Sequence, residues 1–137
     1  MRPLIVGEHN PYGSDPHFAL YPAPAGSAGA RLAVILAMRR GQYLEAFDRV
    51  NLLTRDRWSL PLAREAAARL AHRRRVLLGA KVCAAHGVDF APFHRVAGDG
   101  WWGVVLPHPS GRCRIWNDAG SSDLARAAVR KLLDGGD

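Results

Sequence analysis

The sequence predicts an α/β fold: a three-layer α/β/α sandwich built on a short, mainly parallel four-stranded sheet. Three observations predict it. Apolar runs of strand length recur along the chain, segments of helical length separate them, and polar or glycine-rich loops follow the apolar runs. Alternation of this kind favours a parallel sheet with helices on both faces. We therefore expect a single domain over residues 1–137, a length typical of one core.

The first part of the chain predicts a strand, a long loop and a helix. Residues 4–6 are a short apolar run that ends at Gly7, as in a buried strand. Residues 8–26 contain many residues that favour loops, including four prolines and two glycines, and a loop of this length is usually functional or disordered. Ser27 is a favourable N-cap for the next helix, and Gly41 is expected to end it.

The middle of the chain predicts a second strand between two helical segments. A short helical piece is expected around residues 43–47 and a strand over residues 49–53. Residues 59–73 predict a helix that begins at a serine N-cap and buries Leu62. The three arginines at 73–75 are interpreted as the solvated end of this helix, with a DNA clamp as the alternative.

The last part of the chain predicts two more strands. Residues 76–79 form the third strand, and a short helix over residues 81–86 follows it. A turn at residues 99–100 precedes the fourth strand, over residues 103–106. The final helix is expected over residues 123–133, before a pair of glycines.

The composition favours a basic globular protein. Hydrophobic residues make up 48% of the chain, and no run approaches the roughly 18 apolar residues that span a membrane. The formal net charge is +7, and almost all cations are arginines because Lys81 and Lys131 are the only lysines. This excess suits a polyanion such as DNA, although arginine codons of a GC-rich genome produce it too. Cys83 and Cys113 cannot form a disulfide framework or a four-cysteine cluster, and a reducing cytoplasm is expected.

Three polar segments are expected to meet at one edge of the sheet. Residues 7–13 (GEHNPYG) follow the first strand, residues 49–53 (RVNLL) carry an amide in the second, and residues 106–112 (LPHPSGR) follow the fourth. Because ligands bind at the carboxyl ends of parallel strands, we expect one site there. A small nucleotide-binding protein is disfavoured, since no glycine-rich phosphate loop follows the first strand.

These segments resemble the uracil-DNA glycosylase superfamily. Asn10 and the proline after it match the family's Gly-x-(Asp or Asn)-Pro signature, with one extra residue after Gly7 relative to the shortest form. Asn51 stands where the family has an asparagine on the second strand, and residues 108–110 match its His-Pro-Ser motif.

The resemblance covers roughly residues 3–117, because residues 76–81 are also similar to the family's apolar third strand. It implies a monofunctional glycosylase that flips a base out of single- or double-stranded DNA and cuts its N-glycosidic bond. Such an enzyme begins base-excision repair as a monomer, with no cofactor, metal, membrane or protein partner. No lysine is expected in the site to form a Schiff base, so no lyase activity is expected.

The resemblance implies catalytic roles for Asn10 and His108. Asn10 would orient the attacking water, and His108 would stabilise the anionic base that leaves. An amide is a very poor base, so we expect slow chemistry or a better leaving group, and Glu8 or His9 is a candidate for the missing basicity. The alternative is that Asn10 only starts a turn before proline.

Four residues are expected to bind the flipped base. Asn51 offers a donor and an acceptor to the edge of uracil or, with its amide turned, of cytosine; the alternative is a buried structural amide. The resemblance implies that Tyr12 crowds the base at C5 and excludes thymine. Phe18 or Tyr21, in the long loop, is expected to stack on the base.

Further DNA contacts are expected in the loop after the His-Pro-Ser motif, which in the family wedges into the minor groove. The apolar wedge residue of some members is missing, so Arg112 is the candidate that plugs the gap, and Arg114 would contact phosphate. Ser110 and Gly111 complete the predicted DNA-binding residues.

Two alternatives stay open. One is a glycosylase specific for a hypermodified pyrimidine in viral or foreign DNA, which the altered wedge and water-activating positions allow. The other is a non-catalytic DNA-binding member of the fold, for which Asn10 in place of aspartate is the main support.

Overall fold

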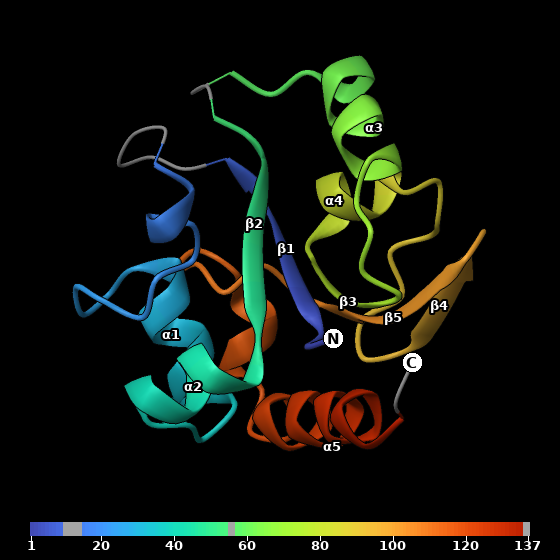
Figure 1. The fold of residues 1–137 in the computed structure, drawn as a ribbon. Coiled ribbons are helices and arrows are strands. Elements are labelled where there is room, and N and C mark those ends of the chain that lie inside the picture. Colours follow the sequence, from blue (N-terminus) through green and yellow to red (C-terminus); the bar gives the residue numbers. More distant parts are fainter. Residues whose placement is uncertain (10–14, 55–56, 136–137) are drawn as a thin grey trace.

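The computed structural model describes residues 1–9, 15–54 and 57–135 (Figure 1). Its elements, in chain order, are β1 (Leu4–His9), η1 (Pro16–Phe18), α1 (Ala28–Ile35), α2 (Arg40–Ala46), β2 (Asp48–Leu53), α3 (Leu60–Ala68), β3 (Arg74–Leu78), α4 (Ala80–Ala85), β4 (Arg95–Gly98), β5 (Trp101–Leu106), η2 (Arg114–Asn117) and α5 (Ser121–Asp134).

One mixed sheet organises the chain, in the order β2-β1-β3-β5-β4. The first four strands in this order are parallel, and β4 pairs antiparallel with β5. The α/β prediction is confirmed, but the predicted count of four strands is wrong. The strand that was not predicted, β4, is short and mostly exposed, so its sequence lacks the apolar run from which a buried strand is predicted. The predicted turn at residues 99–100 is the hairpin that joins it to β5.

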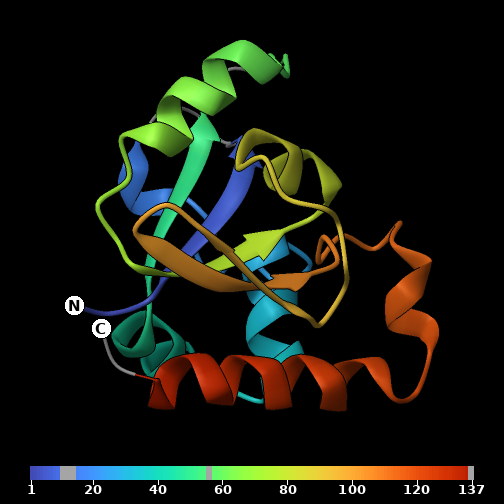
Figure 2. The ribbon, with the colours of Figure 1, turned by 90° about the vertical axis from the view of Figure 1, so that its right-hand side faces the viewer.

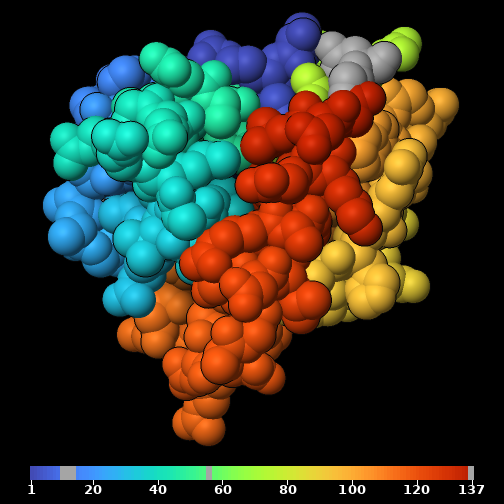
Figure 3. Space-filling view, turned by 90° about the horizontal axis from the view of Figure 1, so that it is seen from below, coloured from blue at the N-terminus to red at the C-terminus, as the bar shows by residue number. Residues whose placement is uncertain are grey.

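Helices cover both faces of the sheet, as Figure 2 shows. Strand side chains alternate between the faces: Ile5 packs under α1, α2 and α5, whereas Leu4 and Val6 pack under α3 and α4. Seen from below in Figure 3, α5 crosses the first of these faces beside α1 and α2. None of the helices in the described ranges is long and apolar enough to cross a membrane.

The N-cap of α1 is confirmed, but the predicted end of the helix is wrong. The Ser27 hydroxyl accepts a hydrogen bond from the Ala30 amide at 3.2 Å. The helix stops at Ile35, and Ala37 takes a left-handed backbone conformation, so the chain turns before Gly41. Gly41 lies inside α2, where its side is open to solvent.

Helix α3 begins as predicted but is shorter than predicted. The Ser59 hydroxyl accepts from the Leu62 amide at 3.4 Å, and the helix ends at Ala68 instead of near residue 73. The expectation that Leu62 is buried is wrong, since it is 45% exposed; Ala63 and Ala67 form the buried face. Small side chains on that face let α3 lie close to β2 and α4.

The interpretation of residues 73–75 as a solvated helix end is also wrong, because Arg74 and Arg75 are buried in β3. The Arg74 guanidinium donates to the carbonyls of Leu132 at 2.9 Å and Leu133 at 3.1 Å, near the end of α5, and to Met1 at 2.8 Å. Arg74 therefore donates hydrogen bonds to carbonyls at the end of α5, where the helix itself provides no donor.

The side chain of Arg75 lies on the opposite face of β3 from that of Arg74. It donates to the carbonyls of His72 at 2.9 Å and Leu70 at 3.0 Å and lies over the Trp101 ring. Burial lowers the pKa of Arg75. Both arginines therefore tie the loops at the amino ends of the strands together, and neither is free to clamp DNA.

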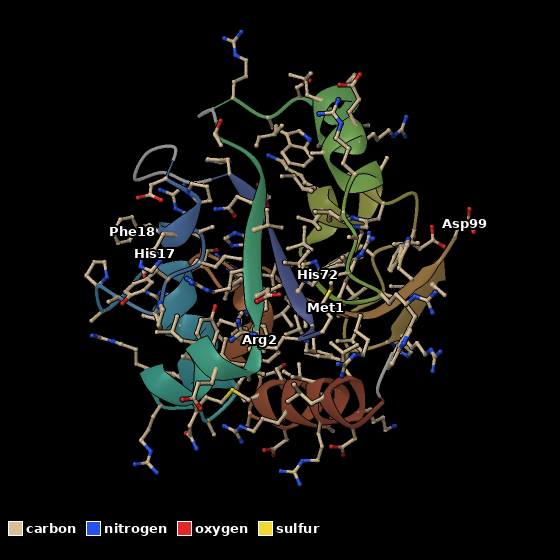
Figure 4. All side chains as sticks on the ribbon, viewed as in Figure 1. Met1, Arg2, His17, Phe18, His72 and Asp99 are labelled. Carbon is tan, nitrogen blue, oxygen red and sulfur yellow. The ribbon has the colours of Figure 1, made fainter. Side chains whose placement is uncertain are left out.

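A polar cluster fixes the amino end of β2. Asp48 binds Arg2 at 3.2 Å and His72 at 2.7 Å, so one carboxylate joins the N-terminal segment to the loop before β3. Figure 4 labels Arg2 and His72 near the lower part of β2. Structural polar contacts thus gather at the amino end of the sheet and leave the opposite end for the pocket described next.

Candidate functional site

An open pocket of about 550 Å³ lies where β1, β2 and β5 end and the loop before α1 passes over them. Parallel strands present their carboxyl ends at one edge of a sheet, where ligands bind in such folds. The described residues that line it are Glu8, His9, Phe18, Leu20, Tyr21, Ala23, Gly26, Ser27, Ala28, Gly29, Arg31, Asn51, His108, Ser110 and Gly111. Six of the predicted site residues are therefore brought together around one cavity.

Asn51 reaches this pocket because its neighbour on β1 is a glycine. Gly7 and Asn51 are register partners, and a Cβ on Gly7 would collide with the amide oxygen of Asn51. The Asn51 side chain makes no hydrogen bond to any other described residue. Its donors and its acceptor are therefore available to a bound molecule.

His108 lies between two prolines directly after β5. Its carbonyl accepts a hydrogen bond from the indole N–H of Trp116 at 3.0 Å, so η2 holds this segment in place. Gly79, at the end of β3, has a φ of +91°, and a Cβ there would stand 3.4 Å from the Cβ of His108. Position 79 thus needs glycine for its backbone conformation.

The imidazole of His108 favours its neutral form. Burial is the largest cause that lowers the pKa of His108; Glu8 raises it, and His9 and Lys81 lower it. A neutral imidazole keeps one N–H donor and one acceptor nitrogen. At neutral pH it can therefore donate a hydrogen bond to a developing anion without adding a full charge.

Of the described residues that line the pocket, Glu8 alone has a carboxylate. Its side chain is 18% exposed, and its Oε2 would lie 3.7 Å from a Cβ on Gly79, on the same side as His108. The Lys81 ammonium stands 4.0 Å from Glu8 Oε1. Lys81 is not among the residues that line the pocket, but the turn at Gly79 brings the start of α4 beside β1 and places this lysine next to Glu8.

His9 also lines the pocket. Its Nδ1 is buried and has no hydrogen-bond partner among the described residues. A buried ring nitrogen without a partner is costly, and a bound ligand can satisfy it. The sequence named His9 only as a candidate for basicity; the signal was its place beside Glu8 at the end of the first strand.

Aromatic side chains form one wall. The rings of Phe18 and Tyr21 pack edge to face with centroids 5.7 Å apart, and His17 contacts both. Arg49 lies over the Tyr21 ring and donates to the carbonyls of His17 and Ala19. Figure 4 labels His17 and Phe18 together at the edge of the molecule, and Phe18 is 50% exposed, which suits an aromatic that meets a ligand.

The loop that carries the aromatic wall is fixed at Leu20 and Tyr21 by contacts with α1 and α2. The buried hydroxyl of Tyr43 donates to the carbonyl of Leu20 at 2.8 Å. Gly29 in α1 lies so close to this loop that a Cβ there would collide with the carbonyl oxygens of Leu20 and Tyr21. Helices α1 and α2 therefore set the position of the aromatic wall.

The segment after His108 forms the opposite rim. Ser110 and Gly111 line the pocket, and the guanidinium of Arg31 lies beside Gly111. Arg112 and Arg114 are exposed and do not line the pocket. Arg31 is a site residue that the sequence did not single out, because on a helix it looks like any other surface arginine.

Two predicted site residues, Asn10 and Tyr12, lie outside the residues that the structure describes. Within the described ranges, no three His, Cys, Asp or Glu side chains gather as a metal site would require. No family model matches the sequence, and no curated protein matches it.

Proposed function

We propose that the protein is a monofunctional DNA glycosylase of the uracil-DNA glycosylase superfamily, which flips out uracil or a related modified pyrimidine and hydrolyses its N-glycosidic bond. One observation carries the proposal: Asn51, His108 and an aromatic wall line the same pocket at the carboxyl end of the sheet. These are the groups that a flipped pyrimidine needs for edge recognition, leaving-group stabilisation and stacking. Two free cysteines favour a reducing cytoplasm as the place of action.

In this proposal, Asn51 selects the base. Its amide pairs with one donor and one acceptor on the pyrimidine edge, and Phe18 or Tyr21 stacks on the ring. Gly7 makes this arrangement accessible, because no side chain fills the space in which the Asn51 amide lies.

His108 stabilises the leaving group. When the bond between the sugar C1′ and the base nitrogen breaks, the electron pair leaves with the base, and negative charge develops on its O2. The neutral imidazole donates a hydrogen bond to this oxygen. Since the Trp116 indole fixes the His108 carbonyl, the donor is positioned before the reaction begins.

Glu8 accepts the proton of the attacking water. The water oxygen forms the new bond to C1′, and its proton passes to the carboxylate, so the products are a free base and an abasic sugar. Glu8 supports this role as the one carboxylate among the described pocket residues, and the Lys81 ammonium stands 4.0 Å from its Oε1.

The size of the pocket favours a second candidate substrate. A cavity of about 150 Å³ holds one benzene ring, whereas this pocket measures about 550 Å³. The remaining volume accommodates either the sugar of the flipped nucleotide or a bulky substituent on the base. A hypermodified pyrimidine in viral or foreign DNA is therefore the alternative substrate.

The proposal is tested by strand cleavage of labelled oligonucleotides after alkali treatment. Uracil, hypoxanthine, hydroxymethyluracil and glucosylated hydroxymethylcytosine are each offered in single-stranded and paired DNA. Wild type is expected to cleave at one of them, and Asn51→Ala and His108→Ala are expected to lose at least about a hundredfold in rate. Asn117→Ala, in the exposed η2 segment, is the matched control and is expected to retain activity.

A binding module without catalysis gives a different result. DNA binding with no cleavage at any base would replace the glycosylase with a non-catalytic member of the fold. The Asn10→Ala variant further separates the glycosylase from the binding module. If Asn10→Ala excises the base more slowly than wild type but binds DNA equally well, Asn10 has a role in positioning the water.

A further inference from the structure

A second hollow, a groove of about 310 Å³, adjoins the proposed base pocket along α1. Side chains of α1 form one wall, and Pro109 and Trp116 form the other. Gly26, Arg31 and Ser110 line both the groove and the pocket, so the two hollows share a rim.

The walls of the groove are apolar and unpartnered. Val34, in the last turn of α1, is 76% exposed, a large exposure for a valine. Opposite it, the Trp116 ring is held by its hydrogen bond to the His108 carbonyl and by an edge-to-face contact with Phe93 at 5.9 Å. A rigid aromatic ring facing an exposed aliphatic side chain is suited to a flat, apolar group.

A fixed cation stands at the shared rim. The Nε of Arg31 donates to the Gly26 carbonyl at 3.1 Å, which orients the guanidinium. Its Nη2 would lie 2.9 Å from a Cβ on Gly111, so the charged group sits against the loop after His108. No carboxylate pairs with Arg31 in the described part of the chain, and its Nη donors are available to an anion.

We propose that the groove is a second nucleotide subsite: it holds the base next to the flipped one, and Arg31 binds the phosphate between the two. This inference rests on the proposed function, because it takes the pocket to hold the flipped nucleotide. A base site, a cation and a second base site in sequence match the base–phosphate–base order of a DNA strand. Stacking and phosphate contact of this kind are typical of single-strand recognition.

A consequence follows for the substrate. If two successive bases leave the stack, the cost of unpairing is higher in a duplex than in a single strand or a bubble. The subsite therefore predicts preference for single-stranded or locally unpaired DNA, and dependence on a base at one neighbouring position.

The test measures binding of single-stranded oligonucleotides by fluorescence anisotropy. The His108→Ala variant is used so that base excision is slow during the binding measurement. Four probes carry uracil at the centre with all bases present, or tetrahydrofuran in place of the 5′ neighbour, the 3′ neighbour or the central uracil itself. Loss of the neighbour on one side is expected to weaken binding by about fivefold or more, and loss on the other side is expected to have little effect.

Variants assign the effect to the groove. In the same background, Val34→Ser is expected to reduce the penalty for the missing neighbour, since the wall that contacts the base is lost. Arg31→Gln is expected to lower the slope of log affinity against log salt by about 0.7, the value for one phosphate of a single strand. Arg130→Gln, on the exposed side of α5 and away from the pocket, is the control and is expected to leave the slope unchanged.

The outcomes separate this inference from the function on which it rests. Dependence on the central uracil without dependence on either neighbour would overturn the subsite and leave the base pocket intact. Equal affinity for all four probes, together with no cleavage by wild type, would overturn both. If the groove binds an apolar peptide instead of a base, Val34→Ser should have no effect on the binding of any DNA probe. That result would also overturn the subsite.

Discussion

The amide oxygen of Asn51 lies in the space that the missing side chain of Gly7 leaves open. The two residues are register partners on β1 and β2, and a Cβ on Gly7 would collide with that oxygen and approach Leu20 Cδ1 to 3.2 Å. The position of the amide in the pocket therefore depends on a glycine in the neighbouring strand, at a point where β1 still pairs with β2.

Gly7→Ala is expected to impair base recognition more than folding. The added methyl group displaces the Asn51 side chain, and a shift of about 1 Å in a positioning group costs about a hundredfold in rate. Steady-state excision and thermal unfolding measure the two effects. Gly41→Ala is the matched control: it lies in α2 with open space around it and should raise stability by up to about 1 kcal/mol with activity unchanged. Full activity of Gly7→Ala would contradict the role of Asn51.

The pKa of His108 is expected to respond to its charged neighbours in opposite directions. Glu8→Gln removes the charge that raises this pKa and should lower it further, whereas Lys81→Met removes a charge that lowers it and should raise it. NMR titration of the imidazole measures both shifts. Lys131→Met, at the far end of α5, removes the same charge and should leave the titration unchanged.

In the proposed reaction, the pKa of His108 should set the pH dependence of the rate. Burial lowers the pKa of His108, so the imidazole takes up a proton only at a more acidic pH than an ordinary histidine does. The excision rate should therefore fall on the acid side, as the imidazole becomes charged. In Lys81→Met the acid limb should move to higher pH. A limb that does not move would show that another group controls it.

Tyr43→Phe is expected to destabilise the fold by about 1–3 kcal/mol, because the carbonyl of Leu20 is left buried without its donor. Urea unfolding measures the loss. Tyr21→Phe is the control, since the Tyr21 hydroxyl makes no hydrogen bond within the described residues; its effect on stability should stay within about 0.5 kcal/mol. A loss for Tyr43→Phe as small as the control's would contradict the account of how the aromatic wall is held.

Arg74→Met is expected to cost roughly 2–4 kcal/mol, because the carbonyls of Leu132 and Leu133 at the end of α5 lose a charged donor. The neighbouring Arg73→Met offers a matched control, as Arg73 is exposed and should change stability by less than about 0.5 kcal/mol. Equal unfolding midpoints for the two variants would show that Arg74 is not needed to end the helix.

Local patterns were sufficient to predict most of the fold. Ser27 and Ser59 cap helices as expected. The apolar runs at residues 4–6, 76–78 and 103–106 lie in the central strands β1, β3 and β5, because such strands are buried on both faces of a parallel sheet. β4 was missed because an edge strand needs no apolar run. Arg74 and Arg75 were misplaced because their burial depends on carbonyls brought from distant parts of the chain.

The site likewise contains residues that the sequence predicted and residues that it did not. Asn51 and His108 were predicted from their places in or after strands and from the resemblance to a glycosylase family, and the structure brings them to one pocket. Arg31 and Lys81 were not predicted, since their roles arise from the packing of α1 and α4 against the ends of the sheet. Nothing in the local sequence of a helix tells which arginine will face a distant loop.

The most direct test of the central claim is the appearance of free base. DNA that carries the base cleaved in the panel is incubated with the protein, and the solution is analysed by mass spectrometry for the base and by an aldehyde-reactive probe for the abasic sugar. The account predicts equal amounts of both products with wild type and, in the same time, at least about a hundredfold less of both with His108→Ala. Strand breakage without free base, or full release of base by His108→Ala, would contradict it.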